Sequence, residues 1–313
     1  MAVETATRTP LEAPRAPRGL RHTARQARRE WTAYLFLMPG FLIFSVFTVF
    51  ALAFTFYLSF HEWNIINVDK PYVGLQNYDD LVHDERFRHA VINTFYFTGA
   101  VVPLQMLGGL VIALLLNTGL RGRTFLRTVY YLPCVTPFVV TAIVWKWFYN
   151  ADFGIFNFYL LKAGLIDAPV SFLSEQNLAM PSVIVMTVYG GIGFTMVVYL
   201  AGLQSIPDEL YEAAKVDGAG MWSRLWHITI PMLRPTTLFL AVIGVIFAFQ
   251  QFTQIFVMTR GGPVDKTTTV LYYIYQTGFG FFEMGYASAM AFVLFLMLLV
   301  FTVLQLRFYR QQI

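Results

Sequence analysis

Six long apolar blocks that lack any charged side chain restrict what this chain can fold into more than any other feature. Their bounds are 34–60, 90–117, 128–145, 178–204, 236–258 and 284–306, and none contains Asp, Glu, Lys or Arg. A helix needs about 20 apolar residues to cross a bilayer, because each residue adds about 1.5 Å. A charge at the bilayer centre costs about 2.5–3.5 kcal/mol, so charge-free blocks insert readily. The sequence therefore predicts an all-α integral membrane protein with six transmembrane helices.

Composition agrees with this prediction. Of the 313 residues, 57% are hydrophobic and only 13% are charged, whereas a soluble domain carries about 25% charged residues. The single cysteine, Cys134, excludes a disulfide framework. The five histidines show no spacing typical of metal ligands, so no metal site is expected.

The distribution of Lys and Arg predicts the orientation in the membrane. Fifteen of these 22 residues lie before the first block, after the second, after the fourth or after the sixth, and seven lie in the other connections. Cytoplasmic segments carry the excess of Lys and Arg. Both termini are therefore expected in the cytoplasm, with the chain crossing the cell (plasma or inner) membrane several times.

Residues 1–30 form an Arg-rich tail that is expected to be cytoplasmic and separate from a transmembrane domain at 31–313. Arg28-Arg29 before an apolar run resembles a twin-Arg export signal. However, that run is too long for a signal sequence and no small-residue cleavage site follows it. A retained cytoplasmic anchor is the favoured interpretation.

A polar, helix-prone island at about 205–235 separates the fourth and fifth blocks. Ser205 is expected to cap a first helix, with Pro207 in its first turn, and Gly218 is placed to end it. A second helix at about 221–230 is expected to end at Pro231. The predicted orientation puts the island in the cytoplasm, within reach of a soluble partner. A solvated amphipathic connector is the simpler alternative.

The order and spacing of residues in the island resemble the EAA motif of ATP-binding-cassette (ABC) importer permeases. That motif reads Glu-Ala-Ala, a Gly six residues after the Glu, and then Ile-x-Leu-Pro. The matching residues are Glu212, Ala213, Ala214, Gly218, Ile228 and Pro231, with Ile230 in place of the Leu. Segments 202–207 and 259–263 also look like the carbohydrate-uptake subfamily of maltose and glycerol-phosphate type. The likeness runs from about Trp31 to the C-terminus and leaves the tail unmatched.

The resemblance implies a six-transmembrane type I ABC importer permease fold. It implies a permease subunit that forms half of the substrate pathway of a binding-protein-dependent sugar importer. The implied partners are a second homologous permease subunit, a dimeric cytoplasmic ATPase that binds ATP and Mg, and an extracytoplasmic substrate-binding protein. The island would be a coupling helix in a cleft of the ATPase, with Asp217 beside the motif and Glu212 paired with a basic residue there. No enzyme activity, no cofactor in this chain and no nucleic-acid partner are expected.

The residues themselves also predict an energy source on another polypeptide. Proton-coupled carriers place acids or histidines within the membrane, and the six blocks contain neither. A Walker A loop ends in Gly-Lys-Ser/Thr, and the chain has no Gly-Lys pair. A stand-alone carrier or channel for a neutral solute stays an alternative that needs an ion relay, gating charges or inverted repeats. An intramembrane enzyme would need a catalytic set at membrane depth. The neighbouring genes would discriminate between these classes.

Polar residues inside the apolar blocks are candidate substrate contacts, because they cost energy unless they find partners. Gln250, Thr253 and Gln254 are spaced to share one helical face, and Phe249 flanks that face. In the fourth block the candidates are Tyr189, Gly190 and Gly193. Helix packing is the alternative role for the glycines, and hydrogen bonding to another helix for the glutamines. Amides and rings without intramembrane Arg or Lys suit a neutral carbohydrate, unless a partner subunit supplies charge.

Aromatic residues gather near the ends of the blocks, where membrane-interface belts form. They are Tyr130, Tyr131, Trp145, Trp147, Tyr149, Tyr272, Tyr273 and Tyr275. Most are expected to anchor helices at the interface.

Overall fold

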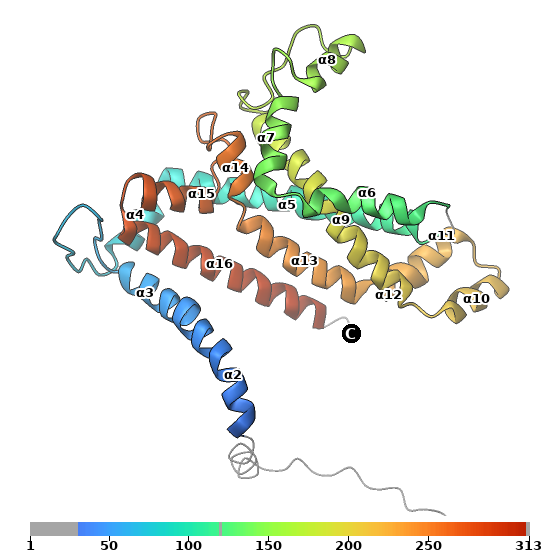
Figure 1. Ribbon diagram of the computed structural model, residues 1–313, viewed down its shortest axis with the longest axis horizontal. Coiled ribbons are helices and arrows are strands. Elements are labelled where there is room, and N and C mark those ends of the chain that lie inside the picture. The colour runs from blue at the N-terminus through green and yellow to red at the C-terminus, as the bar shows by residue number, and fades with distance from the viewer. Residues whose placement is uncertain (1–30, 119–120, 311–313) are drawn as a thin grey trace, which may run out of the picture. The chain divides into compact units, whose positions relative to one another are not determined.

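The computed structural model describes residues 31–118 and 121–310, without the side chains at 31–33 and 308–310, and most of these residues are helical (Figure 1). The Arg-rich tail predicted at 1–30 lies outside the described residues. The chain divides into two compact units, one ending at Phe54 and the other beginning at Thr55.

The first unit holds α2 (Trp31–Phe44), a π-helical turn η1 (Ser45–Phe50) and the start of α3 (Ala51–Leu58). These segments follow one another without a loop, and Tyr34–Leu58 is long and apolar enough to cross a membrane. A helix that is apolar on all sides is typical of a membrane span. The finding agrees with the first predicted span at 34–60, although the helix already ends at Leu58.

The second unit contains the remaining helices, whose order along the chain is as follows. They are α4 (Gln76–His83), α5 (Glu85–Leu116), α6 (Arg123–Val135), α7 (Phe138–Phe148), α8 (Ile155–Lys162), α9 (Ala179–Gln204), α10 (Asp208–Val216), α11 (Met221–Arg224), η2 (Leu225–Thr229), α12 (Ile230–Met232), α13 (Arg234–Phe249), α14 (Thr253–Met258), α15 (Val270–Tyr275), η3 (Gln276–Gly280) and α16 (Met284–Arg310). Helices α4 and α15 lie at one end of this unit, and α10 lies at the opposite end (Figure 1).

The third predicted span is not one straight helix. Helices α6 and α7 meet at an angle of 97°, so the described residues hold five membrane-crossing helices, or six if this bent pair counts as one span. The cause is Thr136-Pro137, where Thr136 is extended with φ −72° and ψ 130°. Proline has no N–H to continue a helix, and it disfavours helical geometry in the residue before it.

The fifth predicted span is also broken, so the expected single helical face is wrong. Helix α13 ends at Phe249, and α14 begins only at Thr253. The carbonyl of Gln251, inside the break, accepts a hydrogen bond from the Thr269 hydroxyl at 3.2 Å. Non-helical backbone at membrane depth is tolerated only where protein or a cavity surrounds it. Thr269, which donates to the free backbone carbonyl in the break, lies beyond the next loop, so the spacing of residues in the span does not reveal it.

The long helices α5 and α9 pack along each other and form the centre of this unit. Gln105 of α5 joins them twice. Its side-chain amide donates to the Thr187 backbone carbonyl at 2.9 Å, and its backbone carbonyl accepts from the Thr195 hydroxyl at 2.9 Å. A side chain at Gly109 would collide with Thr195. The small residue therefore allows the close approach that apolar helices need in a membrane.

Several aromatic residues predicted as interfacial anchors are instead part of the core. Trp145, Tyr149, Tyr272 and Tyr273 are all buried. The Tyr149 hydroxyl donates to the Ser182 carbonyl at 3.1 Å. A buried Tyr needs such a partner for its hydroxyl, and the sequence did not show that one was available.

Candidate functional site

A cavity of about 510 Å³ lies among α5, α6, α7, α9 and the broken α13–α14 segment. Its wall is mainly apolar, with polar side chains placed on four of these elements. The polar lining residues are Gln105, Tyr131, Cys134, Thr187, Thr195, Gln250, Gln251, Thr253 and Gln254. An apolar pocket with a few convergent polar groups is the usual form of a small-molecule site.

Gln254 is the most unusual of these residues. It is only 1% exposed, and neither its amide oxygen nor its amide nitrogen has a hydrogen-bond partner among the described residues. Leaving a buried polar group unpaired costs about 1–3 kcal/mol, and native structures contain few such groups. An amide that lines a cavity and lacks a partner is available to a ligand or to another subunit.

The structure brings together only part of the predicted substrate set. Gln250, Thr253, Gln254 and Gly190 line the cavity, because the helix break turns the three polar side chains into it from separate segments. Gln105 was missed by the sequence interpretation, although it is the one glutamine in the second apolar block. A lone amide in a charge-free block is the signal that would have found it.

The other candidates lie outside the cavity lining. Phe249 is 1% exposed and packs its ring edge-on against Phe95, with centroids 5.2 Å apart. Tyr189 is half exposed, with its ring 5.3 Å from that of Trp145. A side chain at Gly193 would collide with the backbone carbonyl of Tyr130. Close approach of α9 to α6 is therefore the role that the structure shows for Gly193.

The polar island forms a second candidate site at the opposite end of the unit from α4 and α15 (Figure 1). Helix α10 begins at Asp208, and Pro207 occupies the N-cap. The predicted Ser205 cap is wrong, because the Ser205 hydroxyl instead donates to the Gly202 carbonyl at 2.7 Å. Asp208 and Glu209 lie in the first turn, where acidic side chains stabilise the positive end of a helix.

Gly218 ends α10 as predicted. Its φ of +77° lies in the left-handed region that favours glycine. The Gly218 N–H donates to the Lys215 carbonyl at 3.0 Å, and the Ala219 N–H donates to the Ala214 carbonyl at 2.8 Å. This pair of bonds is the Schellman motif, which satisfies carbonyls at the end of a helix.

The second helix of the island does not end at Pro231. It continues from α11 through the π-turn η2 into α12, and only Leu233 separates it from α13. Proline lacks a backbone N–H, but at the start of a helical segment that N–H would have no partner within the helix. Pro231 therefore does not end the helix. The island is therefore joined almost directly to the helix that borders the cavity.

The residues that match the EAA motif divide into two groups by exposure. Glu212 and Ala213 are exposed on α10, and Gly218 is exposed just after its end, as is Asp217 beside the motif. Ala214, Ile228 and Pro231 are half buried, and Ile228 packs on a core cluster that includes Leu203 and Leu240. One side of the island is thus anchored to the bundle, while the other presents a carboxylate and a helix end to a partner.

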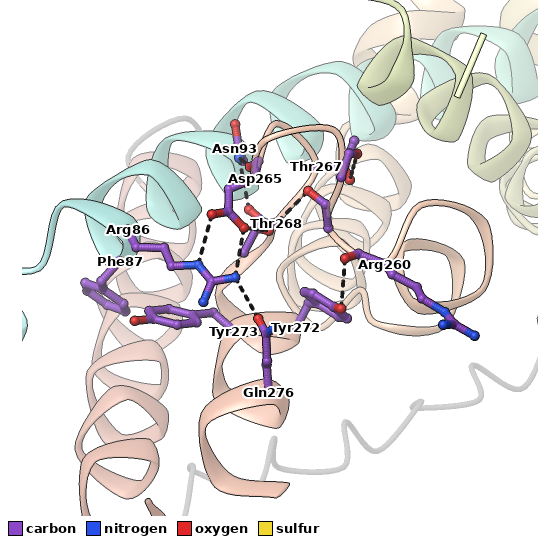
Figure 2. A network of polar contacts seen from close by, with 12 residues as sticks. Arg86, Phe87, Asn93, Arg260, Asp265, Thr267, Thr268, Tyr272, Tyr273 and Gln276 are labelled. Atoms are coloured by element: carbon purple, nitrogen blue, oxygen red, sulfur yellow. Dashed lines mark hydrogen bonds and ion pairs between the residues drawn. The ribbon is translucent and has the colours of Figure 1, made fainter. Parts of the chain in front are cut away.

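A polar network occupies the other end of the unit (Figure 2). Arg86 of α5 donates two hydrogen bonds to the Asp265 carboxylate, at 3.0 and 2.9 Å, and a third to the Gln276 amide oxygen at 2.7 Å. Bidentate arginine–carboxylate pairs combine strength with defined geometry. Asn93 donates to the carbonyls of Asp265 and Thr268. The network thereby fastens the loop that follows α14, in which Arg260 and Gly261 have positive φ.

Asp84 extends the network as the N-cap of α5. Its carboxylate accepts from the N–H groups of Arg86 and Phe87 and from the hydroxyls of Tyr273 and Tyr286. Burial opposes ionisation, but these four hydrogen bonds outweigh it and lower the pKa of Asp84. The pKa of Asp265 is likewise lowered, because the hydrogen bonds and charge of Arg86 outweigh burial.

Comparison with known proteins identifies relatives of this arrangement. A family model described as "Binding-protein-dependent transport system inner membrane component" matches residues 105–312. The chain is 36% identical over 266 residues to a probable ABC transporter permease protein of Pyrococcus horikoshii, covering 85% of this chain and 91% of that protein. It is 33% identical over 277 residues to the trehalose/maltose transport system permease protein MalF of Thermococcus litoralis, covering 88% of this chain and 92% of that one.

A solved structure shows a similar fold. It is a chain of a bacterial ABC transporter involved in the import of the acidic polysaccharide alginate, with a TM-score of 0.82 and 26% identity. The alignment covers 93% of this chain and 99% of that chain. The two chains therefore share their overall fold.

Proposed function

Since the chain belongs to the family of binding-protein-dependent transport system inner membrane components, we propose that it is one permease subunit of an ATP-driven sugar importer. The observation that carries this proposal is the two-sided island. Helix α10 exposes Glu212 and its capped end to solvent, while Tyr211 of α10 and Ile228 of η2 pack on a core cluster of the bundle. A segment built in this way can receive force from a separate ATPase and pass it to the membrane helices.

The cavity supports the second half of the proposal. It is bordered by α13, which the island joins almost directly, so movement of the island would move a cavity wall. Its polar groups are amides, hydroxyls and one thiol, and its lining includes no charged side chain from the residues that the structure describes. Such a lining suits a hydroxyl-rich, uncharged carbohydrate, because every hydroxyl can both donate and accept. An acidic sugar would need a compensating charge from the second subunit.

The remaining parts of the proposal follow from this role. The importer would contain a second, homologous permease subunit, two copies of a cytoplasmic ATPase that hold ATP and Mg, and a binding protein outside the membrane. Both termini and the island would face the cytoplasm, in agreement with the excess of Lys and Arg on that side. Alternating access would then be a rigid-body movement of helices around the cavity.

The test is a charge reversal at Glu212 in the assembled importer reconstituted in liposomes. Glu212→Lys is expected to leave membrane insertion and assembly intact and to abolish uptake that depends on ATP. Glu175→Lys, an equally exposed carboxylate in the connection before α9, is the matched control and should transport normally. Normal uptake by Glu212→Lys would contradict the coupling role. Accumulation of sugar by this chain alone, without an ATPase, would contradict the proposed function as a whole.

A further inference from the structure

A second cavity, of about 400 Å³, lies where the segment after α3, helix α4 and the start of α16 meet. The side chains that matter here are Glu62, Trp63, Asn77, Asp80, Glu283 and Tyr286, all of which line it. It is separate from the membrane cavity, because the two have no lining residue in common.

The walls of this cavity are held by backbone contacts between distant segments. The Gly285 N–H donates to the Trp63 carbonyl at 3.1 Å, and the Glu62 N–H donates to the Pro71 carbonyl at 3.0 Å. A side chain at Gly285 would collide with the His61 carbonyl, so the close approach requires glycine. The cavity is therefore a preformed feature of the fold.

The charged side chains that line this cavity are all carboxylates. Those of Glu62, Asp80 and Glu283 are exposed and form no ion pair or side-chain hydrogen bond among the described residues. The Tyr286 hydroxyl already donates to Asp84 at 2.8 Å, so it does not donate to them. An occupant that pairs with these carboxylates would carry hydrogen-bond donors and a positive charge.

Asn77 provides independent support for an occupant. It is 8% exposed, and its amide nitrogen donates to the carbonyls of Ser59 and His61 at 2.8 and 3.1 Å. These two bonds fix the orientation of the side chain. Asn77 lines the cavity, and its amide oxygen has no hydrogen-bond partner among the described residues. An oriented acceptor that lines the cavity is available to a ligand that donates hydrogen bonds.

The charge of the lining narrows the chemistry of that ligand. Within the part of the chain that the structure describes, no group of three His, Cys, Asp or Glu side chains is placed to hold a metal ion. The basic side chain of this loop, Lys70, donates to the carbonyls of Asn64 and Asn67 and lies over the Trp63 ring. An arginine or lysine side chain from another protein would supply both the donors and the positive charge.

We propose that this acidic cavity receives a Lys or Arg side chain of the extracytoplasmic binding protein. The inference rests on the proposed function, in which the connection between the first two spans faces outward and a binding protein docks there. The floor of the cavity is also stiff, since Tyr286 shares the Asp84 carboxylate with Tyr273, over whose ring Arg86 lies. A rigid support favours docking because less conformational entropy is lost on binding.

The first experiment measures association of the binding protein encoded beside the permease genes with the whole importer in lipid nanodiscs. Complementary charges mainly accelerate association and make it depend on salt. The combined variant Glu62→Gln, Asp80→Asn and Glu283→Gln should therefore associate about tenfold more slowly, with a weaker salt dependence. The control variant Asp152→Asn with Asp167→Asn removes exposed carboxylates of another connection on the same predicted side and should change neither quantity. An unchanged association rate in the combined variant would overturn the proposal.

A second experiment identifies the occupant. Benzoylphenylalanine at Gln76, which lines the cavity, should form a photo-adduct with a basic surface segment of the binding protein. Reversing both charges, with Asp80→Lys and an acidic residue at the captured position, should restore an association that either reversal alone weakens. If free saccharide binds the importer through these carboxylates while binding-protein association is unchanged, the cavity is a sugar site and the proposal is wrong.

Failure of the proposed function would give a different result: the wild-type importer would then neither bind the protein nor show uptake that depends on ATP.

Discussion

The hydroxyl of Tyr211 on α10 lies 3.0 Å from the hydroxyl of Thr229 in η2. Thr229 is buried, and Tyr211 packs on the core cluster that contains Leu203 of α9 and Leu233 before α13. This hydrogen bond and the apolar contacts around it attach α10, which carries the exposed Glu212, to the packed part of the bundle. In the proposed coupling role, displacement of α10 would be transmitted to α9 and α13 through these contacts.

Replacing Tyr211 with Phe should weaken this transmission. The substitution keeps the ring and removes one hydrogen bond, which costs about 1 kcal/mol of stability. We expect the importer to assemble and bind sugar, with less sugar transported per ATP hydrolysed. Tyr159→Phe is the control, since Tyr159 is exposed on α8, far along the chain from the island. An unchanged ratio of transport to hydrolysis in Tyr211→Phe would show that the bond does not transmit movement.

Two neighbouring glycines of the island should differ sharply in their tolerance of alanine. Gly218 has φ +77°, whereas Gly220 has φ −67°, and neither would bring a new methyl group within 4 Å of other atoms. Gly218→Ala should destabilise the end of α10 by about 1 kcal/mol, because the left-handed conformation strains any residue with a Cβ atom. Gly220→Ala should have little effect. Hydrogen exchange of the Gly218 and Ala219 amides measures the difference, and equal protection in both variants would refute it.

Gln254→Leu should separate stability from transport. The substitution removes a buried amide that has no partner among the described residues, so thermal stability in detergent should stay the same or rise. Uptake should fall by about tenfold if the amide contacts sugar, the loss expected for one hydrogen bond to substrate. Gln305→Leu on α16 is the control, because Gln305 has an unpaired amide oxygen but does not line the cavity. Normal uptake by Gln254→Leu would remove Gln254 from the sugar path.

Gly193→Ala should impair folding of the bundle. The added methyl group would meet the Tyr130 carbonyl, and overpacking of this kind costs about 1–3 kcal/mol. Gly99→Ala on α5 is the matched control, because nothing lies within 4 Å of its added methyl group. The melting temperature of the purified importer is the measurement. Equal melting temperatures for the two variants would mean that α6 and α9 can separate without cost.

The Arg86–Asp265 network should lose its effect in acid. The folded pKa of Asp265 lies below its ordinary value of 3.8, so its stabilising effect is present above that value and is lost as the pH falls through the folded pKa. The difference in melting temperature between wild type and Asp265→Asn should stay constant from about pH 7 to about pH 5 and shrink only below about pH 4. If the difference in melting temperature disappeared near neutral pH, a group other than Asp265 would control the stability of the network.

The tertiary structure explains why the sequence interpretation succeeded with the end of α10 and found only part of the cavity lining. The capped end of α10 depends on residues within one helical turn of Gly218, so local spacing predicts it. In the break between α13 and α14, the Gln251 carbonyl accepts a hydrogen bond from Thr269, which lies beyond the next loop. The bend of 97° between α6 and α7 likewise cannot be read from the sequence. Burial of Trp145 and Tyr273 likewise depends on which helices become neighbours.

By itself, the sequence determined the membrane class, the approximate bounds of the long apolar helices, and the position of a polar, capped helix between two of them. These features follow from local properties: the length of apolar runs, the absence of charge, and the glycine that ends α10. Only the tertiary structure decided that Gln105 and Gln254 share one cavity, that Phe249 and Gly193 serve packing, and that Asn77 faces an acidic cavity. Those outcomes depend on contacts between residues far apart in the chain, which hydrophobic spacing along the sequence does not specify.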